Sequence, residues 1–353
     1  MSTRPQTAFV LSGGAALGAI LIGMLRALYE RGIDPDLIVG TSVGAVNGAF
    51  IASRPFTPAT ADQLAEVWHQ VGRGQVFPLN PLTGFLGFFG TRRHLVPDRG
   101  LRDLLIEHLE FERLEQTRVP FHVITTDVLT GSEVRLSRGP ALDAVMASAA
   151  IPGVFPPVDW GHRHLMDGGI ANHAPLSDAL ELGAERVYVL STGIACDLAE
   201  PPHGALGMLL HSMSLLLMRR LQVEVELLAD RAELIVLPPP CPPGSSPIDF
   251  SRSDELIGRA LEESTTFLDK LELGKIEDPA SGLVQAASAP VFSQHEFHRE
   301  RLASPAAPQS GLARSRRRSG LNGYCLEHPA PRRPPQASPA SWRRSGACDP
   351  NQG

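Results

Sequence analysis

The chain has 353 residues, of which 43% are hydrophobic and 20% are charged, as is ordinary for a soluble globular protein. Its formal net charge of -6 argues against nucleic acid as a partner for the whole chain. The length allows about two domains, although α/β folds often place 250 or more residues in one.

The four cysteines show no C-x-x-C or metal-ligand spacing, and they stand at Cys196, Cys241, Cys325 and Cys348. We therefore expect free thiols in a reducing compartment and no metal site. The apolar run at 8–28 is interrupted by glycines and then takes on helix periodicity. We expect it to be part of the fold and not a targeting segment, with the cytoplasm as the default location.

Strands and helices alternate along the first half of the chain. Short β-type runs predict strands at 7–11, 37–39, 121–125, 133–136, 164–166, 186–190 and 234–237. Apolar residues at helical spacing predict helices at 19–31, 60–71, 100–110, 141–150, 175–182, 204–229 and 254–273. This order predicts an α/β fold with a central, mostly parallel sheet and crossover helices.

Three further segments have a distinct composition. The helix at 204–229 is rich in Leu and Met, which we expect to fill a core. Segment 76–95 sets four Phe residues among Pro and Gly. It suggests buried loop packing, with an apolar flap over a lipid site or a membrane-touching patch as the alternative. Residues 281–353 are rich in Pro, Ser and Arg, with ten Arg and no Lys against four acidic residues, and predict a disordered tail.

The stretch 37–51 contains a candidate nucleophile. Gly40-Thr41-Ser42-Val43-Gly44 follows a short apolar run and precedes a run of Ala, Val and Gly that can pack only as a helix. A G-x-S-x-G between a strand and a helix is typical of a nucleophile elbow, in which small residues permit the tight turn. A glycine-softened turn without chemistry is the alternative, and Ser42 is the leading candidate nucleophile.

A serine nucleophile requires donors for the oxyanion, and the small-residue loop at 12–18 could supply them. The backbone N–H groups of Gly13, Gly14 and Ala15 would converge beside Ser42 if two adjacent parallel strands end at one sheet edge. The N–H of Val43 would be a further donor. The loop lacks both G-x-G-x-x-G and G-K-[ST], which weakens the alternative of a nucleotide site.

The general base is less evident from the residues alone. Asp167 stands between a short strand and the turn Gly168-Gly169, where it could equally cap the turn. His162, His164 and His173 flank it, so a Ser–His–Asp triad stays open at this point.

The set LSGGAALGA, GTSVGA, ASAAIPGVFPP and MDGGIANHAP, in this order, resembles the patatin-like phospholipase family over about residues 7–237. The resemblance implies a three-layer α/β/α fold and a Ser–Asp dyad without histidine or cofactor. Ser42 would attack the acyl carbonyl and Asp167 would take its proton. Gly13, Gly14 and Ala15 would form the oxyanion hole, and Gly40, Gly44, Gly168 and Gly169 would complete the motifs.

The chain departs from the common family loop G-G-G-x-[RK]-G at two positions. Ala15 replaces the third glycine and Leu17 replaces the basic residue, which puts a preference for anionic head groups in doubt.

We therefore predict a domain at 5–280, a tail at 281–353, and hydrolysis of a carboxylic ester of a lipid, with possible peripheral membrane contact. The alternatives are a Ser–His–Asp esterase that uses His173 or His164, and a non-catalytic lipid- or nucleotide-binding protein of the same fold.

Overall fold

The computed structural model describes residues 5–72, 76, 96–193, 204–240, 249–274 and 276. The predicted tail at 281–353 and all but Val76 of the predicted flap at 76–95 lie outside these residues.

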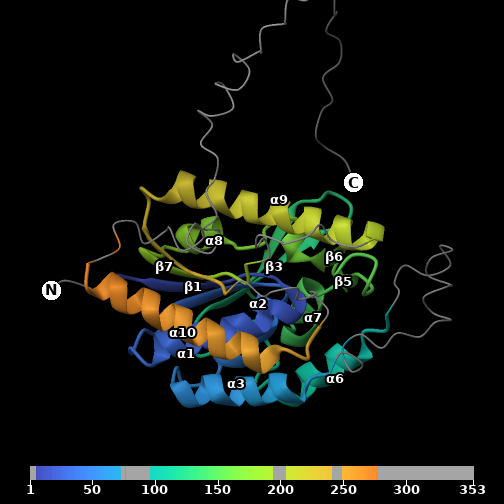
Figure 1. The fold of residues 1–353 in the computed structure, drawn as a ribbon. Coiled ribbons are helices and arrows are strands. Elements are labelled where there is room, and N and C mark those ends of the chain that lie inside the picture. The colour runs from blue at the N-terminus through green and yellow to red at the C-terminus, as the bar shows by residue number, and fades with distance from the viewer. Residues whose placement is uncertain are drawn as a thin grey trace, which may run out of the picture. The chain divides into compact units, whose positions relative to one another are not determined.

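An eight-stranded sheet forms the centre of the fold (Figure 1). Its strands are β1 (Thr7–Leu11), β2 (Leu37–Thr41), β3 (Phe121–Asp127), β4 (Glu133–Leu136), β5 (Val158–Trp160), β6 (Arg163–Asp167), β7 (Arg186–Leu190) and β8 (Glu233–Leu237). The order is β5-β6-β3-β2-β1-β7-β8, and β4 also pairs with β3. The five strands β3, β2, β1, β7 and β8 run parallel, whereas β4, β5 and β6 join by antiparallel pairings.

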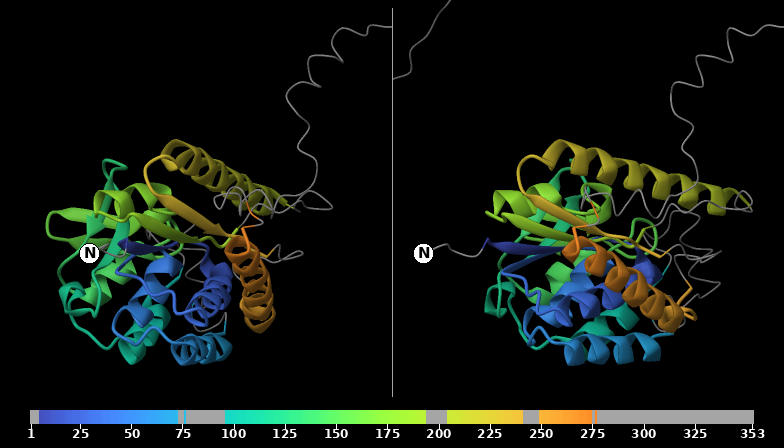
Figure 2. Two further views of the ribbon diagram at one scale, coloured as in Figure 1. Left: turned by 90° about the vertical axis from the view of Figure 1, so that its left-hand side faces the viewer. Right: turned by 60° about the vertical axis from the view of Figure 1, so that its left-hand side comes forward.

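Helices cover both faces of the sheet, as Figures 1 and 2 show. One face carries α1 (Ala19–Tyr29), α2 (Val43–Ala52), α3 (Pro58–Gln70), α6 (Arg99–His108), α7 (Ala141–Ser148) and α10 (Ser253–Glu272). The other face carries α8 (Leu176–Glu181) and α9 (Gly204–Leu228). Short 3-10 turns occupy Ala15–Gly18, Leu114–Gln116 and Gly168–Ile170. The predicted three-layer α/β/α fold is confirmed.

Two hydrophobic cores follow from the alternation of side chains along the strands. On β1, Phe9 and Leu11 belong to the core beneath α1 and α2, whereas Ala8 and Val10 belong to the core beneath α8 and α9. Successive side chains of a strand point to opposite faces, so a central strand buried on both faces is apolar throughout. This explains why β1 and β2 are short continuous apolar runs in the sequence.

The antiparallel hairpin of β5 and β6 was only partly predicted from the sequence. Pro152, Pro156 and Pro157 precede β5, and no strand was predicted at Val158–Trp160. Among the described residues, no helix is long and apolar enough to cross a membrane.

Candidate active site

The predicted elbow is present as a sharp turn between β2 and α2. Ser42 has φ +54° and ψ -125°, a conformation that a non-glycine residue adopts only under strain. A Cβ atom on Gly44 would stand 2.1 Å from the carbonyl oxygen of Leu11, and one on Gly40 would stand 2.7 Å from that of Gly44. Glycine is therefore required at both positions, because the helix starts directly against the neighbouring strand.

Ser42 and Asp167 are joined by a hydrogen bond although 125 residues separate them. The Ser42 Oγ donates to Asp167 Oδ2 at 2.6 Å, and both side chains are buried. The second carboxylate oxygen, Oδ1, accepts the backbone N–H of Gly169 at 2.7 Å. The carboxylate is thus held by the turn that follows it, and its other oxygen faces the serine.

The position of Asp167 follows from the edges of β3. β2 pairs with β3 as far as Thr41 and Ile124, and Asp167 of β6 pairs with the next β3 residue, Thr125. β4 occupies the opposite edge along this stretch. β6 therefore continues along the edge of β3 that β2 leaves at the elbow, which brings Asp167 next to Ser42.

The turn after Asp167 packs directly on β3. A Cβ atom on Gly168 would stand 2.2 Å from the carbonyl oxygen of Ile124, so only glycine fits there. Thr126 strengthens the junction, because its Oγ1 donates to the Asp167 carbonyl at 2.8 Å.

Burial raises the pKa of Asp167 to about 6, although its hydrogen bonds from Ser42 and Gly169 oppose the shift. Desolvation disfavours the charged carboxylate, and the two donors favour it. A carboxyl group with such a pKa is mostly ionised at neutral pH yet basic enough to accept a proton from a serine.

The small-residue loop lies beside Ser42, as predicted from the pairing of β1 with β2. The backbone N–H of Gly13, however, already donates to the carbonyl of His173 at 3.1 Å. Among the described residues, the N–H groups of Gly14, Ala15 and Val43 have no acceptor. These three are the better candidates for oxyanion donors, and Gly13 has a different partner.

Thr192, two residues after the end of β7, anchors the loop and was not among the predicted site residues. Its Oγ1 donates to the Gly13 carbonyl at 2.6 Å, and its backbone N–H donates to Ser12 Oγ at 3.0 Å. Ala15, which stands where the family has a third glycine, has φ +50°. It is one of two non-glycine residues with positive φ in the described chain, and Ser42 is the other.

Neither candidate histidine is hydrogen-bonded to Ser42. His173 is buried, with its ring against Gly13, and its Nε2 has no partner among the described residues. Burial, aided by the charge of Arg220, lowers the pKa of His173 to about 4. The Nδ1 of His164 lies 2.6 Å from Asp159 Oδ1 at the exposed end of the β5–β6 hairpin.

Ser148 supports the elbow from α7 and was also missed as a candidate. Its Oγ accepts the backbone N–H of Ser42 at 2.8 Å and donates to the carbonyl of Ile124 at 2.6 Å. The segment ASAAIPG was identified as part of a family motif. The sequence does not indicate, however, that a serine in a small-residue helix has a tertiary hydrogen-bond partner.

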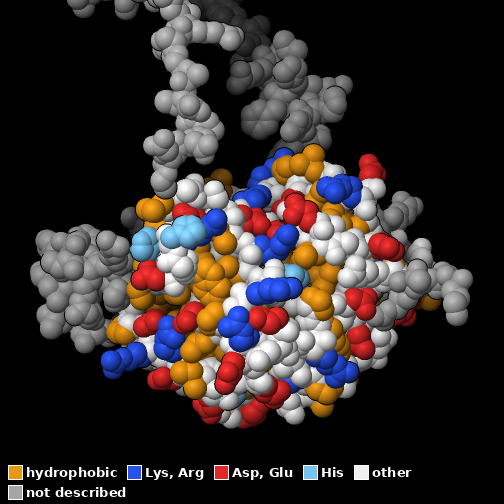
Figure 3. Space-filling model, turned by 180° about the vertical axis from the view of Figure 1, so that it is seen from behind, with side chains coloured by type: hydrophobic (Ala, Val, Ile, Leu, Met, Phe, Trp, Pro, Cys, Tyr) orange, Lys and Arg blue, Asp and Glu red, His pale blue; other side chains and the backbone are white. Residues whose placement is uncertain are grey.

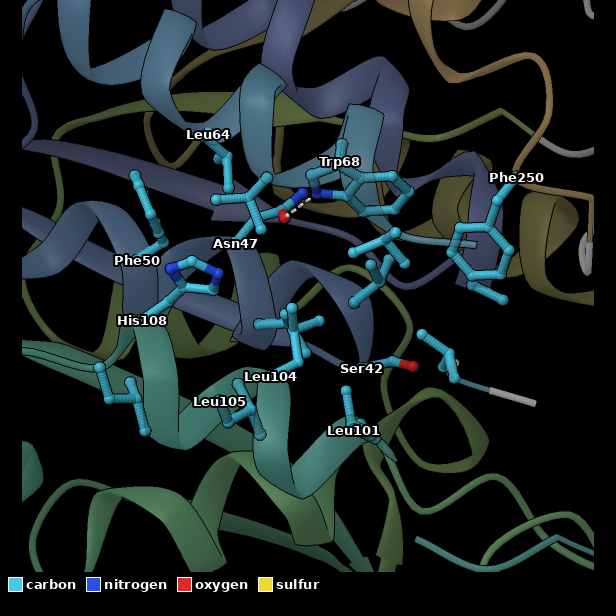
Figure 4. Close-up of a pocket in the computed structure, with 18 of the residues that line it drawn as sticks. Ser42, Asn47, Phe50, Leu64, Trp68, Leu101, Leu104, Leu105, His108 and Phe250 are labelled. Carbon is cyan, nitrogen blue, oxygen red and sulfur yellow. Dashed lines mark hydrogen bonds between the residues drawn. The ribbon is translucent and has the colours of Figure 1, made fainter. Parts of the chain in front are cut away.

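A cavity opens at Ser42 and runs between α2, α3 and α6 (Figure 4). One face of α2 lines it with Val43, Val46, Asn47 and Phe50. The other walls are almost wholly apolar and include Leu64, Trp68, Leu101, Leu104, Leu105, Ile151, Phe155 and Phe250.

Two of the polar side chains in this wall, Asn47 and Trp68, have partners within the protein. The Nε1 of Trp68 donates to Asn47 Oδ1 at 3.0 Å, as the dashed line in Figure 4 marks, and Asn47 Nδ2 donates to the Gly18 carbonyl. A chain of methylene groups would therefore meet an apolar surface. Within the described residues, no group of three or more His, Cys, Asp and Glu side chains is placed to hold a metal ion.

Comparison with known proteins gives consistent matches. Residues 9–180 match the family model described as Patatin-like phospholipase. The chain is 34% identical over 202 residues to patatin-like phospholipase domain-containing protein 7 of Mus musculus, covering 55% of this chain and 14% of that protein. It is 31% identical over 191 residues to an uncharacterised NTE family protein of Mycobacterium tuberculosis, covering 54% of this chain and 50% of that protein.

The chain thus spans half the length or less of these curated relatives. Among solved structures, VipD from Legionella pneumophila matches with a TM-score of 0.37 and 13% identity, over 85% of this chain and 76% of that chain, which is a distant likeness.

Proposed function

Since residues 9–180 of this chain belong to the patatin-like phospholipase family, we propose that it hydrolyses carboxylic esters of lipids through a Ser42–Asp167 dyad. The observation that carries the proposal is the 2.6 Å hydrogen bond from Ser42 Oγ to Asp167 Oδ2 at the mouth of an apolar cavity.

In the first half of the reaction, Ser42 Oγ attacks the ester carbonyl carbon while its proton passes to Asp167 Oδ2. The carbonyl oxygen becomes an oxyanion, which the N–H groups of Gly14, Ala15 and Val43 would stabilise. When the tetrahedral intermediate collapses, the bond to the alcohol oxygen breaks and the alcohol takes the proton from Asp167. An acyl group is then bound to Ser42 as an ester.

In the second half, water attacks the acyl-enzyme and gives a proton to Asp167. A second tetrahedral intermediate collapses, Ser42 regains its proton, and the carboxylic acid leaves. The raised pKa of Asp167 supports this role, because a base near pH 6 can both accept and return a proton at neutral pH.

The cavity supports a lipid in the acyl position. Its α2 wall runs from Ser42 to Phe50, eight residues or ~12 Å along the helix axis. An extended acyl chain advances by ~1.3 Å per carbon, so this wall accommodates about nine carbons. A chain of this length, buried against apolar side chains, gains the binding energy that a small polar ester lacks.

Hydrolysis of p-nitrophenyl butyrate by the full chain, with Ser42→Ala and Asp167→Asn compared in parallel, tests the mechanism. Both variants should lose activity by at least about a thousandfold, as is usual for a residue that acts directly in acyl transfer. Ser53→Ala, at the other end of α2, is the matched control and should retain full activity.

His173→Asn separates the dyad from a histidine-dependent triad. A dyad enzyme should keep activity within about tenfold, since His173 supports the loop but moves no proton. Full loss in His173→Asn together with an active Asp167→Asn would refute the dyad. No hydrolysis of model ester or phospholipid by the unmodified chain would favour a lipid-binding protein.

A further inference from the structure

The helix α9 is apolar on its outer side as well as its inner side. Met218, Leu221, Val225 and Leu228 face the core beneath the helix. On the outer side, the side chain of Leu216 is 71% exposed and that of Leu227 is 73% exposed. The prediction that the Leu and Met residues of this helix fill a core is therefore wrong for the five that are exposed, Met208, Met213, Leu215, Leu216 and Leu227.

The core-facing residues all lie in the second half of α9, whereas the first half carries a cluster of exposed apolar side chains. These are Met208, Met213, Leu215 and Leu216. An exposed apolar group of this kind on a surface helix indicates a partner surface, because apolar area in water is unfavourable.

The first half of α9 lies at the same edge of the sheet as Ser42. The helix connects β7 to β8, which are parallel neighbours, so it must run back against the strand direction. Its N-terminus is therefore at the carboxyl ends of the strands, where the elbow follows β2. In Figures 1 and 2, α9 lies across the top of the sheet, above α8.

The charge near these apolar residues is positive. Residues 204–221 contain no Asp or Glu but include Arg219 and Arg220, both exposed. Arg219 donates to Gln222 at 3.3 Å. Arg220 forms no ion pair in the described part of the chain, although its charge favours the ionised form of Glu133 on β4. Figure 3 shows hydrophobic, basic and some acidic side chains along the upper edge, where Figure 1 places α9.

We propose that this surface, formed by Met208, Met213, Leu215, Leu216, Arg219 and Arg220, binds the surface of an anionic phospholipid bilayer. Apolar side chains of an interfacial helix enter the boundary between head groups and acyl chains, and arginines pair with lipid phosphates. Residues 204–221 contain no acidic side chain. In a symmetric dimer this surface would face its own copy, and the arginines of the two copies would repel each other, so an anionic lipid surface is the favoured partner. Such contact would turn the edge of the sheet that carries Ser42 toward the lipid.

Sedimentation of the full-length chain with phosphatidylcholine vesicles, with and without phosphatidylglycerol, measures this binding. The Ser42→Ala variant is used throughout, so that the measurement does not depend on hydrolysis. Binding should require phosphatidylglycerol and weaken as salt is added, because salt screens exposed charges.

Three variants in that background locate the surface. Leu215→Ser with Leu216→Ser should weaken binding at least about tenfold, and Arg219→Gln with Arg220→Gln should do likewise, since each arginine near an anionic surface contributes about fivefold. Leu227→Ser is the matched control, because Leu227 is as exposed as Leu216 on the same helix but lies beside Glu226 and far from the Ser42 edge. It should bind like the parent.

Three outcomes would overturn the proposal. The first is that the parent chain binds no vesicles. The second is that all variants bind equally, which would assign binding to the arginine-rich segment after residue 280. The third is a dimer in gel filtration that Leu215→Ser with Leu216→Ser converts to a monomer, which would identify a second copy as the partner. The same substitutions are also made with Ser42 intact. Hydrolysis of a soluble butyryl ester at the parent rate shows that they preserve the fold.

Discussion

The hydroxyl of Ser148 accepts the backbone N–H of Ser42 and donates to the carbonyl of Ile124, so one side chain links the elbow to β3. All three groups are buried in the part of the chain described. The strained backbone of Ser42 therefore has a specific tertiary support, which comes from α7.

Ser148→Ala should remove that support and leave a buried N–H and a buried carbonyl without partners. We expect a loss of about 1–3 kcal/mol in the free energy of unfolding and a fall in kcat of about tenfold, with a smaller change in KM. Urea denaturation and steady-state kinetics measure the two effects. Ser132→Ala, on an exposed turn, is the control; an unchanged kcat in Ser148→Ala would show that the elbow holds its shape unaided.

The activity should decline in acid with the ionisation of Asp167. Its pKa is raised to about 6 by burial, and only the carboxylate can accept the Ser42 proton. Below pH 6, kcat/KM should therefore fall by about tenfold per pH unit. Tryptophan fluorescence at each pH checks that the chain is still folded. An activity that is flat down to pH 4 would exclude Asp167 as the base.

Replacing Asp167 by Asn should make the protein inactive and more stable at alkaline pH. The pKa of Asp167 in the fold, about 6, is above the ordinary value of 3.8 for this carboxyl group. The protonated group thus stabilises the fold fully below pH 4, and this contribution is lost as the pH rises through 6. At pH 8 we expect Asp167→Asn to raise the free energy of unfolding by about 1–3 kcal/mol.

Thermal unfolding of the parent chain and of Asp167→Asn at pH 4 and pH 8 measures this gain in stability. The gain should shrink or vanish at pH 4, where Asp167 is itself neutral. A gain of equal size at both pH values would assign the effect to packing and not to charge.

Ala15→Gly should be tolerated, in contrast to glycine at the next position. Ala15 has φ +50°, where a side chain costs about 1–2 kcal/mol and glycine does not. That relief offsets the greater freedom of glycine in the unfolded chain, about 0.4–1 kcal/mol. Ala16→Gly, in the same turn but without positive φ, should lose about 1 kcal/mol.

Denaturant curves for these two variants should therefore differ by about 1 kcal/mol or more in favour of Ala15→Gly. Ala15 also lines the cavity next to Ser42, so removal of its methyl group should favour bulkier esters. Equal losses in the two variants would mean that the strain at Ala15 is not relieved by glycine.

Val46→Phe should shorten the acyl chain that the cavity accepts. Val46 lies on the α2 face between Ser42 and Phe50, so a phenyl ring there would obstruct the cavity midway. We expect kcat/KM for a dodecanoyl ester to fall by at least about tenfold and that for a butyryl ester to change by less than about twofold. Val128→Phe, on the exposed turn after β3, is the control, and equal losses on both esters would contradict a chain running along α2.

Much of the parallel core was predictable because its signals are local. β1 at Thr7–Leu11 and β7 at Arg186–Leu190 were predicted to the residue, and so was the antiparallel strand β4 at Glu133–Leu136. Short apolar runs bounded by Gly, Pro and polar residues indicate strands whatever their partners are. The elbow was predictable for the same reason, because G-x-S-x-G between a strand and a helix specifies a tight turn without any distant residue.

The long-range parts were not predictable in the same way. The β5–β6 hairpin depends on pairing with β3, and its prolines hid the strand at Val158–Trp160. The hydrogen bonds of Ser148 with Ser42 and of Thr192 with Gly13 join segments more than a hundred residues apart. The local sequence around a serine or threonine does not indicate such a partner. The use of the Gly13 N–H by His173 is a tertiary contact of the same kind.

The continuation of one edge of β3 from β2 into β6 has a consequence for folding. Thr41 and Asp167 occupy consecutive places along β3, so a slip of one residue in the β3–β6 register would turn the Asp167 side chain to the opposite face of the sheet. Ester hydrolysis is then a reporter of correct strand registration. During refolding, it should return only after this non-local antiparallel pairing has formed, later than the appearance of helical signal.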